Sequence, residues 1–161
     1  GEENKGMREM FLMMNEARLL VGFQGFACAT ASYLSALNYA RERIQGRPLT
    51  AGKDASAGGV SIIQHPDVRR QLMEMKVFVE GMRSLIYYVG YCQDMVGLAE
   101  NDEEKEKYEG LVDILTPIVK GYGPDKAFEV TSHGVQIYGG YGYTKEYPVE
   151  QYLREIGRAH V

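Results

Sequence analysis

The chain has 161 residues, of which 45% are hydrophobic and 25% charged, and this balance excludes a disordered chain and fits one globular domain. The net charge is −4 and the basic residues are scattered, which argues against a nucleic-acid-binding protein or a basic membrane-surface patch. The longest uninterrupted apolar run is too short to span a bilayer, so no membrane span is expected.

A long first helix is predicted from Met7 to Gln45, because bulky apolar residues recur there at three- and four-residue spacing. They are Leu12, Leu19, Phe23, Phe26, Tyr33, Leu37 and Ala40. A second stripe consists of small residues, namely Gly22, Gly25, Ala29, Ser32 and Ala36. Since small side chains allow a neighbouring backbone to approach closely, we expect this helix to pack on two sides, as the central helix of a bundle does.

Residues 46–65 form a long connection rich in Gly, Ala and Ser, and loops of this length are commonly functional or mobile. Pro66 then opens a second helix, with His65 as its expected cap and Asp67 in its first turn. A heptad seam interrupted only by Gln93 follows. Its members are Val68, Leu72, Met75, Val79, Met82, Ile86, Val89 and Val96.

The remaining chain predicts two further helices and a short last one. Residues 101–107 are charged and predict a hinge before a third helix, and the Gly121–Pro124 stretch predicts its end or a kink. A fourth helix is expected from Asp125 to about Tyr138, and a short one begins near Pro148. No strand-like alternation of convincing length occurs. The sequence therefore predicts an all-α, up-and-down four-helix bundle over residues 7–161.

The cysteines and histidines indicate no metal site. Cys28 and Cys92 both lie in helical patterns and are expected in the core, which gives no disulfide framework and favours a reducing, cytoplasmic compartment. The three histidines have no metal-ligand spacing with Asp, Glu or Cys.

Three glycines in four positions distinguish the segment QIYGGYGY, residues 136–143. One interpretation is a left-handed helix cap followed by a tight turn. The other is a bare backbone that a phosphate can approach, with Gln136 supplying hydrogen bonds. The segment is not the dinucleotide fingerprint, because no strand precedes it and the spacing differs.

Two further places carry charge within apolar surroundings. Arg41 and Arg43 stand at the end of the first helix, where arginines offset the helix dipole or bind phosphate oxygens. Glu16 and Arg18 are two residues apart and so do not face each other on a helix. We expect one of them to be solvated and the other to point into a cleft.

Several segments, in this order, resemble the acyl-CoA dehydrogenase family. They are residues 14–19 (MNEARL), 39–46 (YARERIQG), 127–130 (AFEV), 136–143 and 146–152 (EYPVEQY), and the resemblance covers about residues 8–155. Residues 62–70 (IIQHPDVRR), with the long loop before them, are similar to a bacterial subgroup with an enlarged C-terminal region.

The resemblance implies the C-terminal helical bundle of a protein that also has an N-terminal helical domain and a middle β-barrel domain. Family members use FAD to oxidise acyl-CoA thioesters to trans-2-enoyl-CoA, as in fatty acid β-oxidation, and pass electrons to an electron-transferring flavoprotein. A homodimer or homotetramer is therefore expected. The alternative is a non-catalytic helical scaffold or oligomerisation domain.

The resemblance also assigns residues. Arg43 would contact the FAD pyrophosphate of a neighbouring subunit, Gln136, Gly139 and Gly140 would contact the adenine-side half of FAD, and Arg18 would lie near the acyl-CoA.

The family's catalytic glutamate is expected beyond Val161, in a Tyr-Glu-Gly-Thr stretch. A minority of members place this base where Ala17 stands here, and Glu16 lies about 100° further round the helix. No catalytic base is thus expected in this chain, which alone should be inactive, and the tail 156–161 departs from the family pattern.

Overall fold

The computed structural model describes residues 2–52 and 58–156 and contains four α-helices over these ranges. They are α1 (Gly6–Glu42), α2 (Pro66–Leu98), α3 (Asp102–Tyr138) and the short α4 (Val149–Glu155). Short 3-10 helices occur at Leu49–Ala51, Ile62–Gln64 and Gly139–Tyr143. Over the same residues the only extended pairing is an isolated antiparallel bridge between Ile44 and Ser61. The all-α prediction is confirmed.

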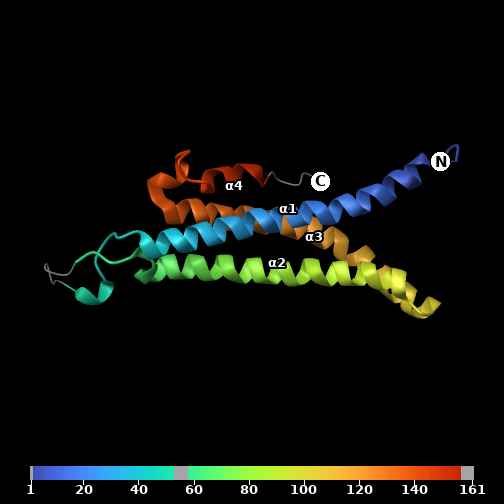
Figure 1. Ribbon diagram of the computed structural model, residues 1–161, viewed down its shortest axis with the longest axis horizontal. Helices are drawn as coiled ribbons and strands as arrows, with labels where there is room; N and C mark the ends of the chain where they lie inside the picture. The colour runs from blue at the N-terminus through green and yellow to red at the C-terminus, as the bar shows by residue number, and fades with distance from the viewer. Residues whose placement is uncertain (1, 53–57, 157–161) are drawn as a thin grey trace.

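The three long helices lie alongside one another, and α3 packs extensively against both α1 and α2, which contact each other less (Figure 1). The chain reverses direction at each connection, and α4 returns along α3 and α1. Two connections therefore meet at one end of the bundle: the loop between α1 and α2, and the glycine turn between α3 and α4. Arg43, at the end of α1, and the glycine turn, residues 136–143, both lie at this end.

The stripe of small residues on α1 is buried and lets α3 approach. A Cβ atom added at Gly22 would lie 2.3 Å from Val119 Cγ1, and one added at Gly25 would lie 3.2 Å from the Pro124 Cα atom. The expected close approach of a neighbouring backbone is thus confirmed. On α2 the apolar seam is buried from Leu72 to Val89, and it continues through the fully buried Cys92. Cys28 is partly buried, as a packing residue would be.

The predicted hinge at residues 101–107 is wrong, because Asn101 is the N-cap of α3 and residues 102–107 already belong to the helix. The Asn101 side chain caps the helix by accepting a hydrogen bond from the Glu104 backbone N–H at 2.9 Å. Three acidic residues, Asp102, Glu103 and Glu104, occupy the first turn, where negative charge favours the helix.

The predicted end of the third helix at Gly121–Pro124 is also wrong, and the expected fourth helix is the second half of α3. The helix continues through Pro117 and Pro124, although each proline removes a backbone donor. Gly123 and Pro124 are buried against α1, where a Cβ atom on Gly123 would come within 3.5 Å of Gly22. The close contact between the two helices outweighs the local preference to end.

The predicted loop at residues 46–65 is present, and its described parts contain two 3-10 helices and the bridge at its base. Residues 53–57 lie outside the described residues, so mobility stays a prediction. By length and composition alone, α1 is apolar enough to cross a membrane. This observation is weak, because the core helix of a bundle meets the same criterion.

Candidate functional site

The structure brings Arg43 and the glycine pair Gly139–Gly140 into one cavity of about 490 Å³ at the loop end of the bundle. Arg43 comes from the end of α1, and the glycines come from the turn that follows α3. The cavity is lined by Tyr39, Arg43, Gln45, Tyr138, Gly139, Gly140, Tyr141 and Thr144. Ninety-six positions of sequence separate Arg43 from Gly139, so the bundle topology alone makes them neighbours.

Gln136 lines a second cavity, of about 370 Å³, and this cavity also has Gly139 and Gly140 in its wall. The glycine pair therefore belongs to both cavities. Four of the five predicted site residues meet at this place, on either side of one short stretch of backbone. Among the described residues, neither cavity has an Asp or Glu in its lining.

Different structural reasons account for the glycines at positions 139, 140 and 142 of the turn. Gly139 ends α3 with φ +61°, a left-handed conformation that favours glycine. A Cβ atom at Gly142 would lie 2.4 Å from the Val135 carbonyl oxygen, so the turn packs there against backbone. At Gly140, no atom of the described residues outside the local backbone lies within 4 Å of such a Cβ atom. The cap interpretation thus explains Gly139 and Gly142, and it leaves Gly140 as bare backbone facing open space.

The position of Arg43 in the cavity is suited to binding an anion. Its backbone N–H donates to the Tyr39 carbonyl at 2.8 Å and closes the last turn of α1. Its guanidinium lies over the Tyr141 ring, 5.3 Å from the centroid, an arrangement that leaves the in-plane N–H groups free to donate. The Nε atom is buried and has no hydrogen-bond partner among the described residues. Because an unpaired buried donor is costly, an acceptor supplied by a ligand would stabilise the site.

Four tyrosines cluster beside Arg43, and three of them, Tyr39, Tyr138 and Tyr141, line the cavity. Tyr39 and Tyr138 stack with ring centroids 4.0 Å apart, and Tyr147 contacts both rings as well as Tyr141. The Tyr138 hydroxyl donates to the Ser35 carbonyl at 3.2 Å. Burial raises the pKa of Tyr39, an effect that the charge of Arg43 partly offsets, and burial also raises the pKa of Tyr138. Both phenols are therefore neutral at physiological pH and add no negative charge beside Arg43.

The sequence interpretation missed this tyrosine cluster. Tyr138, Tyr141 and Tyr147 surround the glycine motif in the sequence, and their density was the signal that could have revealed them. Amphipathic tyrosines at a motif that exposes backbone are typical of a binding surface.

Arg18 lies apart from this site. It stands 25 residues before Arg43 on the same helix, which corresponds to roughly 38 Å along the axis. Its Nη1 donates to the Asn15 side-chain oxygen at 3.0 Å. The structure therefore does not bring Arg18 together with the other predicted residues.

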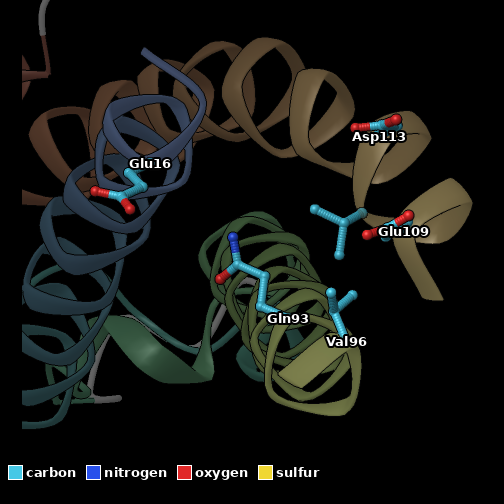
Figure 2. Close-up of a pocket in the computed structure, with 6 residues that line it drawn as sticks. Glu16, Gln93, Val96, Glu109 and Asp113 are labelled. Atoms are coloured by element: carbon cyan, nitrogen blue, oxygen red, sulfur yellow. The ribbon is translucent and has the colours of Figure 1, made fainter. Parts of the chain in front are cut away.

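Glu16, on the neighbouring face of α1, lines a larger cavity of about 720 Å³ (Figure 2). Gln93 and Val96 come from α2, and Glu109 and Asp113 from α3, on the other side of this space. Of the Glu16 and Arg18 pair, Glu16 is thus the residue that borders a cleft. Three carboxylates in the lining disfavour a phosphate. Among residues 2–52 and 58–156, no three His, Cys, Asp or Glu side chains are placed so that they could hold a metal ion together.

Comparison with known proteins matches nearly the whole chain to one family. The family described as acyl-CoA dehydrogenase, C-terminal domain, matches residues 4–159. A 3-methylmercaptopropionyl-CoA dehydrogenase of Ruegeria pomeroyi is 48% identical over 96% of this chain and 26% of its own length. A broad-specificity linear acyl-CoA dehydrogenase of Mycobacterium tuberculosis is 38% identical over 96% of this chain and 26% of its own length. The chain thus spans about a quarter of these curated relatives.

Solved structures agree with this placement. Butyryl-CoA dehydrogenase from Megasphaera elsdenii superposes with a TM-score of 0.73 at 29% identity, over 97% of this chain and 34% of that one. A nitroalkane oxidase superposes with a TM-score of 0.66 at 24% identity over 88% of this chain and 28% of that one, a likeness that shows the fold alone.

Proposed function

The chain belongs to the acyl-CoA dehydrogenase family, of which it is a C-terminal domain, and from this premise we propose that it supplies part of the FAD site of an acyl-CoA dehydrogenase. The reaction of the whole protein is the α,β-dehydrogenation of an acyl-CoA thioester to trans-2-enoyl-CoA. When bound, FAD supplies the hydride acceptor for this chemistry. An electron-transferring flavoprotein is the proposed next acceptor.

One observation carries the proposal: Arg43, with an unpartnered buried Nε, and the bare backbone of Gly140 line the same cavity. A diphosphate fits this donor set, because the described residues of the lining offer one cation and no carboxylate. Arg43 would bind the pyrophosphate oxygens, and Gly139 and Gly140 would let the ligand approach the backbone. Gln136 would donate a hydrogen bond from the adjoining cavity on the adenine side.

The acidic cavity beside Glu16 is a poor alternative for such a ligand. Its carboxylates would repel phosphate oxygens, whereas the cavity at Arg43 attracts them. The cavity at Arg43 is therefore the better site for a phosphate-bearing ligand, although the acidic cavity is the larger of the two.

Proton abstraction from the substrate is not a role for this chain. Ala17 has no acid or base group, and we propose that a glutamate elsewhere in the whole protein acts as the base. Arg18, in the first half of α1, is the proposed residue near the acyl-CoA.

A homodimer or homotetramer in the cytoplasm is proposed for the whole protein. In support, Leu20, Phe23, Tyr87 and Tyr91 are exposed large hydrophobic side chains that line an apolar cavity between α1 and α2. A contiguous apolar surface of this kind is typical of a contact with another domain or subunit.

The test uses the full-length protein that contains this domain, stripped of flavin and titrated with FAD. Gly140→Val should weaken FAD binding by at least about tenfold, or about 1.4 kcal/mol, because a side chain would occupy the cavity. Circular dichroism should show an unchanged fold, since the added Cβ atom meets open space.

Gly121→Val is the matched control, because it also meets open space but lies on α3 away from both cavities. It should leave the FAD affinity unchanged. Loss of stability in Gly140→Val without any change in FAD affinity would favour the scaffold alternative, in which the glycine turn is only a helix cap.

A further inference from the structure

The base of the loop between α1 and α2 is tied directly to Arg43. The Ile62 backbone N–H donates to the Arg43 carbonyl at 2.9 Å. Two more backbone bonds follow, from Gln45 to the Val60 carbonyl at 2.9 Å and from Val60 to the Gly46 carbonyl at 3.0 Å. Arg43 and Gln45, which both line the 490 Å³ cavity, therefore belong to the bridge that closes the loop.

The opposite side of this bridge is anchored in the bundle. Ile62 is buried and belongs to the hydrophobic core, and α1 and α2 both contact its 3-10 helix. The carbonyl of Arg43 is thus held by a residue whose own position is fixed by core packing. A change in the loop base would be transmitted to Arg43 through one hydrogen bond.

His65 adds a side-chain bond to the same structure. It is the N-cap residue of α2, but its side chain makes no capping hydrogen bond. Instead the ring Nε2 donates to the Gln45 carbonyl at 2.8 Å, across twenty residues of sequence. The ring also packs against Gly46, whose φ is +76° and where a Cβ atom would lie 3.2 Å from Nε2.

We propose that His65 is a positioning residue for the phosphate site: by fixing the Gln45 carbonyl, it holds the bridge that presents Arg43 to the cavity. This inference rests on the proposed function, because it assumes that Arg43 binds a phosphate group. His65 itself does not line the cavity and acts through Gln45 and Arg43.

The N-cap location of His65 allows positioning to be separated from stability. His65→Asn introduces one of the best capping residues, so the helix should not lose stability. The asparagine amide nitrogen is one covalent bond closer to Cα than the histidine Nε2, so it does not reach the Gln45 carbonyl and the hydrogen bond is lost. His65→Gln places an amide donor near the position of Nε2 and should restore the bond.

The experiment measures the FAD dissociation constant and Tm of the flavin-free full-length protein and its variants. His65→Asn should weaken FAD binding by about three- to tenfold, the range for one lost hydrogen bond, with Tm unchanged or raised. His65→Gln should bind within about twofold of the wild type. The control is Gln64→Ala in the same turn, whose side-chain amide donates to the Ser61 hydroxyl at 3.4 Å and not to Gln45, and FAD binding should stay unchanged.

A double-mutant cycle with Arg43→Gln identifies the route of the effect. If His65 acts through Arg43, then His65→Asn should cost little further affinity once Arg43 has been replaced. Additive losses, or a His65→Asn variant with wild-type affinity, would overturn the positioning role while leaving the proposed function intact. If neither Arg43→Gln nor Gly140→Val changes FAD binding, then the proposed function itself fails, and the role of His65 fails with it.

Discussion

Gly142 should be the glycine of the turn on which stability depends most. A Cβ atom there would lie 2.4 Å from the Val135 carbonyl oxygen and 3.1 Å from the carbonyl carbon, so the turn or α3 must move by about 1 Å to reach ordinary contact. Both atoms belong to backbone, which yields less easily than a flexible side chain. Overpacking of this kind costs about 1–3 kcal/mol. Gly142→Ala should therefore lower the free energy of unfolding by about 2 kcal/mol.

Gly140→Ala is the internal comparison, since its Cβ atom meets no atom within 4 Å. It should be neutral or stabilise the domain by up to about 1 kcal/mol, because alanine restricts the unfolded chain. The assay is urea denaturation of the 161-residue chain followed by circular dichroism at 222 nm. Equal stabilities of the two variants, or a less stable Gly140→Ala, would refute the close contact between Gly142 and α3.

Two other changes test the helix starts. Asn101→Ala should lower the free energy of unfolding by about 1 kcal/mol in the same urea assay, because the Glu104 backbone N–H loses its acceptor, whereas Asn101→Asp should retain most of the stability. At the start of α2, hydrogen bonds from Arg70 and Gln71 lower the pKa of Asp67, so its contribution is present above the ordinary carboxyl pKa and is lost as pH falls through the lower folded value. Asp67→Asn should therefore reduce Tm at pH 7 and approach the wild-type Tm in strong acid, and a difference in Tm that does not change with pH would contradict this assignment.

Most of the helical architecture could be predicted from periodicity. The small-residue stripe and the heptad seam are long-range patterns, and both identified buried faces of α1 and α2. The failures came from short local signals. Gly121–Pro124 is a local signal for a helix end, yet the burial of Gly123 and Pro124 against α1 holds the helix together there. Asn101 with Glu104 is itself a start signal, which the charge of the surrounding segment obscured.

The site was less accessible to sequence reasoning. Arg43 and the glycine turn were each weak signals, and the resemblance to a family, not their spacing, joined them. The cavity that they share depends on how α1 and α3 end at the same end of the bundle. The orphaned Nε of Arg43 and the bond from His65 to Gln45 depend on side-chain geometry, which no pattern of residue types encodes.

The close contact between α1 and α3 also has a consequence for synthesis on the ribosome. Gly22 meets Val119, a residue translated about 100 positions later, which at about 5–20 residues per second corresponds to roughly 5–20 seconds. During that interval α2 can pair with α1, but the small-residue stripe has no partner. The nascent domain therefore exposes an apolar helix face until α3 emerges. A chaperone that binds such faces would bind α1 during this interval.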